Sequence, residues 1–165
     1  MQINIGLEKV EKILHVADIH IRNFKRHKEY RQVFRKLYKD AKQLPKNSII
    51  YVAGDIVHTK TDISPELVEL TSEFFRKLAD IRPTIVITGN HDANLNNSSR
   101  LDALSPIIDN LNHPNLHYLK DSGIYRVCDI DFIVMSVFDE PKDFPDARKA
   151  SGIKIGLHHG PVHNS

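Results

Sequence analysis

Three short apolar runs in this sequence end in the same way, in side chains that can bind a metal ion. The runs are residues 13–17, 49–53 and 84–88. Apolar runs of this length, bounded by turn residues, are typical of buried strands. The polar residues that follow them are Asp18, His20, Gly54, Asp55, Gly89, Asn90, His91 and Asp92. Because parallel strands end at one edge of a sheet, the repetition predicts one shared site.

Helical patterns lie between these strands. The predicted helices cover about 26–44, 65–79 and 100–110. Pro45 ends the first helix, and Ser64 with Pro65 provides an N-cap and a first-turn proline for the second. Ser99 and Asp102 resemble a capping box for the third. Strands that alternate with helices predict an α/β fold with a largely parallel sheet.

After residue 110 the pattern changes to short strands. They are predicted over 116–119, 124–127, 132–137 and 153–157. The second and third are close enough in sequence to form a hairpin, so this part is expected to be more antiparallel. The last strand ends in His158 and His159, which makes it a fourth strand that delivers a possible ligand.

The charge of the chain is unevenly distributed. The net charge is +2, but residues 22–42 carry nine Lys or Arg against Glu29 and Asp40. This segment is either the solvated face of a helix or a surface for a phosphate-rich partner. Arg22, Lys25 and neighbouring cations gather where the helix starts, and the helix macrodipole disfavours cations there. That placement favours the phosphate-rich partner.

Length and composition predict one globular domain that spans residues 1–165. No segment approaches the roughly 20 apolar residues of a membrane span, and the N-terminus lacks the pattern of a secretory signal. Cys128 is the only cysteine, which suits a reducing compartment. We expect no membrane association and a cytoplasmic protein, or one in the host cell compartment if the source is viral, and not a secreted one.

The polar strand ends have the composition of a metal site. Asp18 and His20 are two residues apart, so in an extended segment their side chains point to the same side. Asp55 could bridge two ions, with Asn90 and His158 serving the second. Oxygen and nitrogen ligands without thiolate suit Mn²⁺, Fe, Zn²⁺ or Mg²⁺. Asp-x-His and Gly-Asp each also occur as plain turn features, and His159 is an alternative to His158.

Two ions about 3.5–4 Å apart would orient a phosphate and activate water for phosphoester hydrolysis. His91, next to a predicted ligand, is the candidate donor of a proton to the leaving oxygen, and Asp92 would orient its ring. His58 is a second catalytic candidate. The sequence has neither a Gly-x-Ser-x-Gly elbow nor a Walker-type glycine loop, so other common hydrolytic chemistries lack support.

The order of these motifs resembles that of the calcineurin-like metallophosphoesterases, over nearly the whole chain. Residues 54–58, followed by 59–61 and a helix start at 64–65, look like the SbcD-type exonucleases of DNA double-strand-break repair. Residues 93–97 and 100–102 are similar to versions carried by large DNA viruses and phages.

The resemblance implies a β-sandwich flanked by helices in αββα layers, with a mixed sheet. It also implies a two-metal, usually Mn²⁺-dependent nuclease that acts on DNA ends, forms a homodimer and is partnered by an SbcC-type coiled-coil ATPase. Its implied metal ligands are Asp18, His20, Asp55, Asn90 and His158. Its implied catalytic residues are His91 and His58.

The sequence departs from this family in one respect. The family closes its site with a Gly-His-x-His motif, and no such motif occurs before Ser165. We therefore expect the domain to be incomplete at its C-terminus, with weak metal binding and little activity of this chain alone. A small-molecule or protein phosphatase and a non-catalytic scaffold with the same fold remain alternatives.

Overall fold

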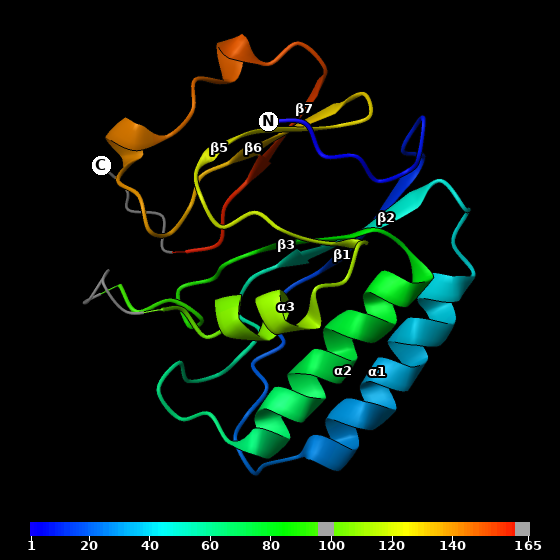
Figure 1. The fold of residues 1–165 in the computed structure, drawn as a ribbon, viewed down its shortest axis with the longest axis vertical. Coiled ribbons are helices and arrows are strands. Elements are labelled where there is room, and N and C mark those ends of the chain that lie inside the picture. The colour runs from blue at the N-terminus through cyan, green and yellow to red at the C-terminus, as the bar shows by residue number, and fades with distance from the viewer. Residues whose placement is uncertain (96–100, 161–165) are drawn as a thin grey trace.

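Two β-sheets organise the chain (Figure 1). The computed structural model describes residues 1–95 and 101–160. The first sheet contains, in spatial order, β1 (Lys12–Val16), β2 (Ser48–Ala53), β3 (Thr84–Ile87) and β4 (Leu116–Tyr118), all parallel. The second sheet contains β5 (Gly123–Val127), antiparallel to β6 (Ile130–Val134), which pairs in parallel with β7 (Ile153–Leu157). The predicted parallel sheet and the later hairpin are confirmed.

Helices connect the four strands of the first sheet. The helices are α1 (His27–Lys42), α2 (Pro65–Ile81) and α3 (Ser105–Leu111). The Ser64 side chain accepts a hydrogen bond from the backbone N–H of Leu67 at 3.2 Å, and Pro65 occupies the first turn, as predicted for α2. Each helix returns the chain to the end of the sheet at which the previous strand began. The strands β1, β2 and β3 therefore run in one direction, and their carboxyl ends lie together.

The third helix begins later than predicted, at Ser105 and not near residue 100. Asp102, predicted to lie inside a helix, precedes it: one carboxylate oxygen accepts hydrogen bonds from the backbone N–H groups of Leu104 and Ser105. Burial opposes ionisation, but Lys120 and Ser105 hold the pKa of Asp102 below its ordinary value. The predicted cap at Ser99 lies outside the described residues.

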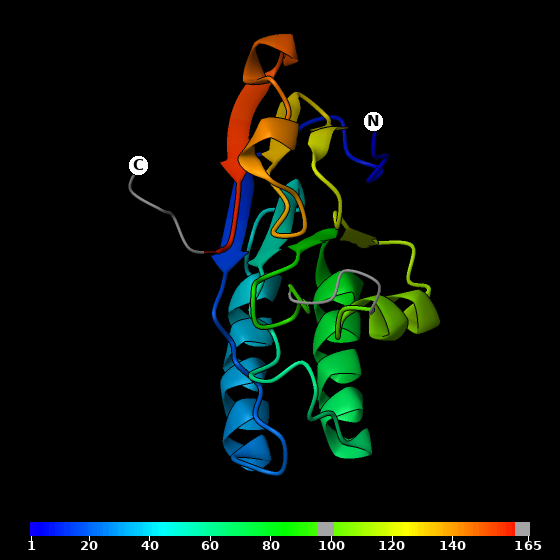
Figure 2. The ribbon, with the colours of Figure 1, turned by 90° about the vertical axis from the view of Figure 1, so that its left-hand side faces the viewer.

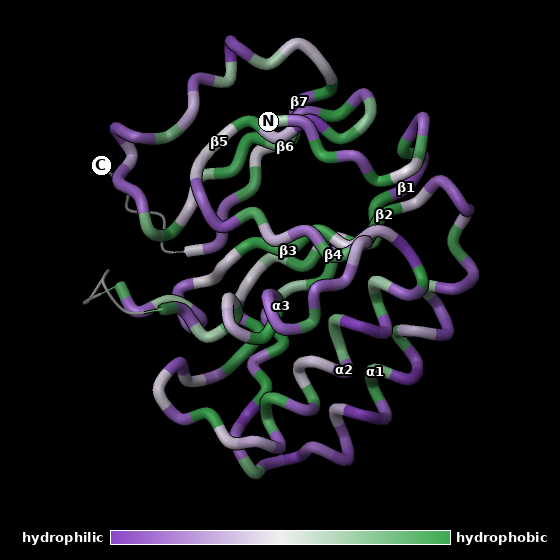
Figure 3. Tube along the Cα trace, viewed as in Figure 1, coloured by the Kyte–Doolittle hydropathy of each residue, from purple (hydrophilic) through white to green (hydrophobic). Residues whose placement is uncertain are grey.

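The elements form three layers, visible edge-on in Figure 2. α1 and α2 cover one face of the first sheet, where Phe34, Leu70 and Phe74 are buried with Val52 and Val86. The second sheet covers the other face. The side chains buried between the sheets include Tyr51, Ile85, Tyr125, Phe132 and Leu157. The apolar strands therefore lie in the middle of the molecule, and the polar sides of the helices face outward (Figure 3).

Both faces of the first sheet are thus covered, which explains why β2 and β3 are buried along their whole length. The predicted α/β fold with a mixed sheet and flanking helices is confirmed. Beyond the second sheet, residues 1–95 and 101–160 supply only two 3₁₀ turns, Pro141–Asp143 and Ala147–Lys149, in place of a second helical layer. None of the described helices has the length and apolarity needed to cross a membrane.

Phe74 is the central side chain of the helix-to-sheet core. It is fully buried, and its ring centroid lies 4.5 Å from that of Phe34 on α1. We expect Phe74→Ala to lower the free energy of unfolding by about 3–5 kcal/mol, because a cavity replaces the ring. Urea denaturation measures the change. Val68→Ala on the exposed side of α2 is the control, with a loss within about 0.5 kcal/mol, and equal losses for the two variants would contradict this assignment.

Candidate metal centre

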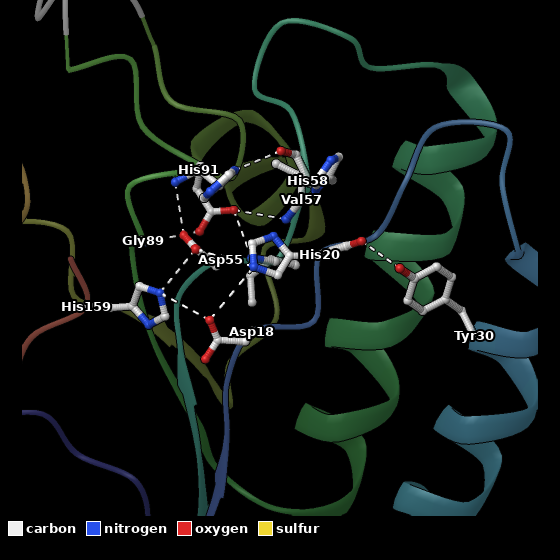
Figure 4. A network of polar contacts seen from close by, with 11 residues as sticks. Asp18, His20, Tyr30, Asp55, Val57, His58, Gly89, His91 and His159 are labelled. Carbon is white, nitrogen blue, oxygen red and sulfur yellow. Dashed lines mark hydrogen bonds and ion pairs between the residues drawn. The ribbon is translucent and has the colours of Figure 1, made fainter. Parts of the chain in front are cut away.

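The carboxyl ends of four strands from the two sheets converge on one group of polar side chains (Figure 4). Asp18 and His20 follow β1, Asp55 and His58 follow β2, His91 follows β3, and His159 follows β7. Their nitrogen and oxygen atoms form two clusters, in each of which the ligand atoms lie within 4.8 Å of one another. One cluster contains Asp18, Asp55 and His159, and the other contains His20, His58 and His91.

In and beside the first cluster, carboxylate oxygens and imidazole nitrogens face one another. His159 Nε2 lies 3.2 Å from Asp55 Oδ2 and 3.7 Å from Asp18 Oδ1. His20 Nε2 lies 3.6 Å from the same oxygen of Asp55 and 3.8 Å from that of Asp18. Three of these four distances are too long for good hydrogen bonds. Two acidic and two imidazole groups that face one another across such gaps have the donor chemistry of a cation site.

The second cluster joins the first through His20. The ring centroids of His20 and His91 are 4.8 Å apart, and those of His58 and His91 are 5.9 Å apart with nearly parallel planes. The Nδ1 atoms of His20 and His58 are buried and have no hydrogen-bond partner in the described part of the chain. Buried polar atoms normally have partners, so these orphaned nitrogens fit coordination of a metal ion.

His91 has one ring nitrogen fixed and one free. Its Nδ1 lies 2.9 Å from the backbone carbonyl oxygen of His58, which makes Nδ1 the protonated donor and leaves Nε2 for proton transfer. Its backbone N–H donates to Asp55 Oδ1 at 2.9 Å. Burial, followed by the positive charges of Arg22 and the neighbouring histidines, lowers the pKa of His58. A neutral His58 ring can act as a ligand or a base.

Asp92 does not orient the His91 ring, so this prediction is wrong. Its carboxylate is buried, with Oδ1 accepting hydrogen bonds from the backbone of Ile56 and Val57 and Oδ2 accepting one from Gly89. Burial raises the pKa of Asp92 to about 7 against the effect of these three donors. The side chain ties the loop after β2 to the loop after β3 and so positions the ligands.

Two glycines let those loops come close enough. Gly54 has a φ of 77°, and a Cβ placed there would lie 2.6 Å from the backbone nitrogen of Gly89. A Cβ on Gly89 would lie 2.1 Å from Oδ1 of Asp55. A larger residue at position 54 would push against the backbone of Gly89, and one at position 89 would displace the Asp55 carboxylate, which explains the glycines before Asp55 and before Asn90.

The backbone at the predicted ligands is not extended. Asp18, His20 and Asp55 have φ values of 54°, 49° and 51°, in the left-handed region that residues other than glycine rarely adopt. The expectation that an extended backbone places Asp18 and His20 on one side is therefore wrong. The two side chains do face one another, but left-handed backbone conformations place them there. Left-handed residues of this kind concentrate at functional sites.

Of the two adjacent histidines after β7, His159 is the one that lies against the carboxylates. Nδ1 of His158, the predicted ligand, lies 2.8 Å from the carbonyl oxygen of Met135, and its ring packs beside Phe144. That hydrogen bond leaves His158 Nε2 available, so both rings keep a ligand atom. Asn90 lines a hollow of about 410 Å³ together with His58 and His91.

Sequence reasoning missed one supporting residue altogether. The Tyr30 hydroxyl on α1 donates a 2.6 Å hydrogen bond to the backbone carbonyl of His20 and holds that ligand in place (Figure 4). In the sequence, Tyr30 is indistinguishable from the other apolar-stripe residues of α1, so no local pattern could have revealed this role. His159, by contrast, was the alternative that the sequence offered to His158.

The fold and these clusters define a class: a two-sheet α/β protein with an oxygen- and nitrogen-rich metal centre at the ends of its strands. A profile of the calcineurin-like phosphoesterase family matches residues 11–165, and the chain belongs to that family. Over 169 aligned residues, the chain is 46% identical to an uncharacterized protein of Acanthamoeba polyphaga mimivirus. The match covers 95% of this chain and 12% of the length of that relative. Members of the family typically bind two divalent metal ions, and the ligands described above suit such ions.

Asp55 tests the metal centre most directly, because it faces His20, His91 and His159. Asp55→Asn keeps an acceptor for the His91 N–H but removes the negative charge. We expect it to weaken Mn²⁺ binding by at least about tenfold in isothermal titration calorimetry, with the missing carboxylate as the cause. Asp109→Asn on the exposed side of α3 is the matched control. Binding of Mn²⁺ by Asp55→Asn as tightly as by the unchanged chain would contradict the assignment.

The link that Asp92 forms between the loops after β2 and β3 can be tested separately. Asp92→Asn keeps the shape of the side chain but turns an N–H donor toward one of the three backbone donors. We expect the free energy of unfolding to fall by about 1–3 kcal/mol, since a buried donor is left without an acceptor. Thermal and urea denaturation without metal measure this loss. If stability is unchanged and only activity falls, Asp92 acts on the chemistry and not on the loops.

Proposed function

We propose that this chain is the catalytic domain of a metal-dependent phosphodiesterase that acts on DNA, an exonuclease of the SbcD type. The observation that carries the proposal is the double cluster of Asp18, Asp55 and His159 with His20, His58 and His91. A site of this composition suits hydrolysis of a phosphoester bond. The motifs after β2 and β3 support DNA as the substrate by their resemblance to that branch of the family.

The residues divide into ligands and a proton donor. Asp18, His20, Asp55, Asn90 and one histidine after β7 would hold two divalent ions, for which we propose Mn²⁺. The chemistry supplied there is Lewis-acid activation of water and of the phosphoryl oxygens. His91 presents Nε2 to the leaving oxygen, because its Nδ1 is fixed on the carbonyl of His58. Asp55 fixes the backbone of His91 and so sets the position of that ring.

A polyanionic substrate fits the charge around the centre. Arg22 and Lys25 lie close enough to His58 to contribute to the lowering of its pKa. Lys60 lines the hollow beside His58 and His91. Cations on the rim of a phosphate-hydrolysing site attract the phosphates that flank the cleaved bond, which a small phosphomonoester does not have.

The wider assembly is part of the same proposal. A homodimer with an SbcC-type coiled-coil ATPase as partner follows from the resemblance to the SbcD-type exonucleases. The second candidate function is a phosphatase of the same family, which the shared metal centre alone also fits. The two differ in salt dependence, because binding to a phosphate backbone weakens steeply as salt rises.

Substitution of His91 tests the proposed nuclease function. We expect the complete gene product, supplied with Mn²⁺, to degrade linear duplex DNA, and His91→Ala to lower kcat by about 10²–10⁴-fold through loss of proton donation. Release of acid-soluble nucleotides is the measurement. His113 precedes β4 and so lies at the end of the first sheet opposite the strand ends that carry the metal centre. His113→Ala is the matched control and should keep full activity.

Two results would overturn the proposal. One is linear duplex DNA that stays intact in the presence of Mn²⁺. The other is a phosphomonoester hydrolysed faster than DNA, with DNA affinity that does not depend on salt, which would favour the phosphatase.

A further inference from the structure

An exposed aromatic ring stands in the loop between the metal centre and α1. Phe24 is 72% exposed. A single exposed apolar residue is ordinary on a protein surface, but the backbone of Phe24 is not ordinary. Its φ is 54°, in the left-handed region, which is an outlier for a bulky side chain. The loop therefore holds this ring outward in a conformation that the residue itself disfavours.

The loop that carries Phe24 is anchored on both sides. Asn23 Nδ2 donates to Asp62 Oδ1 at 2.7 Å, and the His27 ring bonds the carbonyl oxygen of Arg22 at 2.8 Å. Before the loop, the buried Ile21 forms a bridge with Val57. The exposed ring is thus presented by a fixed backbone, which lowers the entropy lost when a ligand packs against it.

Positive charges flank the ring. The exposed cations of the segment are Arg22, Lys25, Arg26 and Lys28. An apolar face beside several cations matches a nucleic-acid strand, in which flat bases alternate with phosphates. A protein partner with an apolar surface would not need these cations.

Phe24 is also near the metal centre. It is four residues after His20, so a fully extended chain would place it at most about 14 Å away. The loop that contains its anchor, Asp62, follows directly from Thr59, Lys60 and Thr61, which line the hollow beside His58. A strand whose phosphate lies at the metal centre therefore has to extend at most about 14 Å from His20 to meet Phe24.

We propose that Phe24 stacks on an unpaired base of the nucleic-acid strand that enters the metal centre. Stacking on a side chain requires a base that is not already stacked inside a duplex, so the loop would select single-stranded or frayed ends. This inference rests on the proposed nuclease function and makes Phe24 a determinant of substrate choice.

Binding without metal tests the inference separately from catalysis. Fluorescence anisotropy would follow a labelled single-stranded oligodeoxynucleotide and an abasic version of the same length. We expect Phe24→Ala to raise the Kd for the base-containing strand about tenfold, a typical effect of losing one stacked base, and to leave the Kd for the abasic strand unchanged. Phe24→Tyr, the matched control, keeps an aromatic face and should bind like the unchanged chain. Circular dichroism of each variant checks that the fold is kept.

Two results would overturn the inference. They are equal Kd values of Phe24→Ala and the unchanged chain for the base-containing strand, or an equal loss of affinity for both strands. If Phe24→Ala weakens oligonucleotide binding while the complete gene product leaves DNA uncleaved, the stacking inference stands and the nuclease proposal fails.

Discussion

The buried carboxylate of Asp92 is the interaction on which the metal centre depends. It accepts backbone hydrogen bonds from Ile56 and Val57 in the loop after β2 and from Gly89 in its own loop after β3, and the two hydrogen bonds of His91 to Asp55 and to the His58 carbonyl join the same loops. Gly54 and Gly89 allow the close approach that these bonds require. A metal site made from separate strand ends needs such links, because they fix the spacing of the loops that carry its side chains. The cost of burying Asp92 is thus part of the cost of holding Asp55 beside His91.

Most of the fold and the location of the site could be predicted because both follow from local patterns. Apolar runs and a 3.6-residue period reveal strands and helices, and a parallel sheet then gathers the strand ends without further information. The contacts that could not be predicted cross between distant segments. Tyr30 reaches His20 from α1, and Asp92 turns inward and away from the adjacent His91. The start of α3 was missed for a similar reason, because the buried Asp102 accepts hydrogen bonds from the backbone just before the helix and pairs with Lys120 from beyond β4.

The two adjacent histidines after β7 show how far sequence alone can resolve a ligand. Neighbouring residues at a strand end point in different directions, so only one of them usually faces a given site. Which one does so depends on where β7 ends against β6, and the register of these strands is set by packing between the sheets. In the structure His159 meets the carboxylates, while the carbonyl of Met135 holds His158. The residue type was therefore predictable, and the position within the pair was not.

The basic segment at 22–42 divides into two parts with different physical roles. Lys28 and Lys42 are about 21 Å apart along α1, at about 1.5 Å per residue, whereas salt screens exposed charges beyond about 8–10 Å. Within this segment, the cations near the start of α1 are therefore the ones placed to act on a phosphate at the metal centre. Lys39 and Lys42 lie in the last turn of α1, where they complement the negative end of the helix dipole. Of the two interpretations of this segment, the solvated helix face thus fits its second half, and the proposed phosphate-binding surface is confined to its first half. The part that an anionic substrate can use is the half that surrounds Phe24.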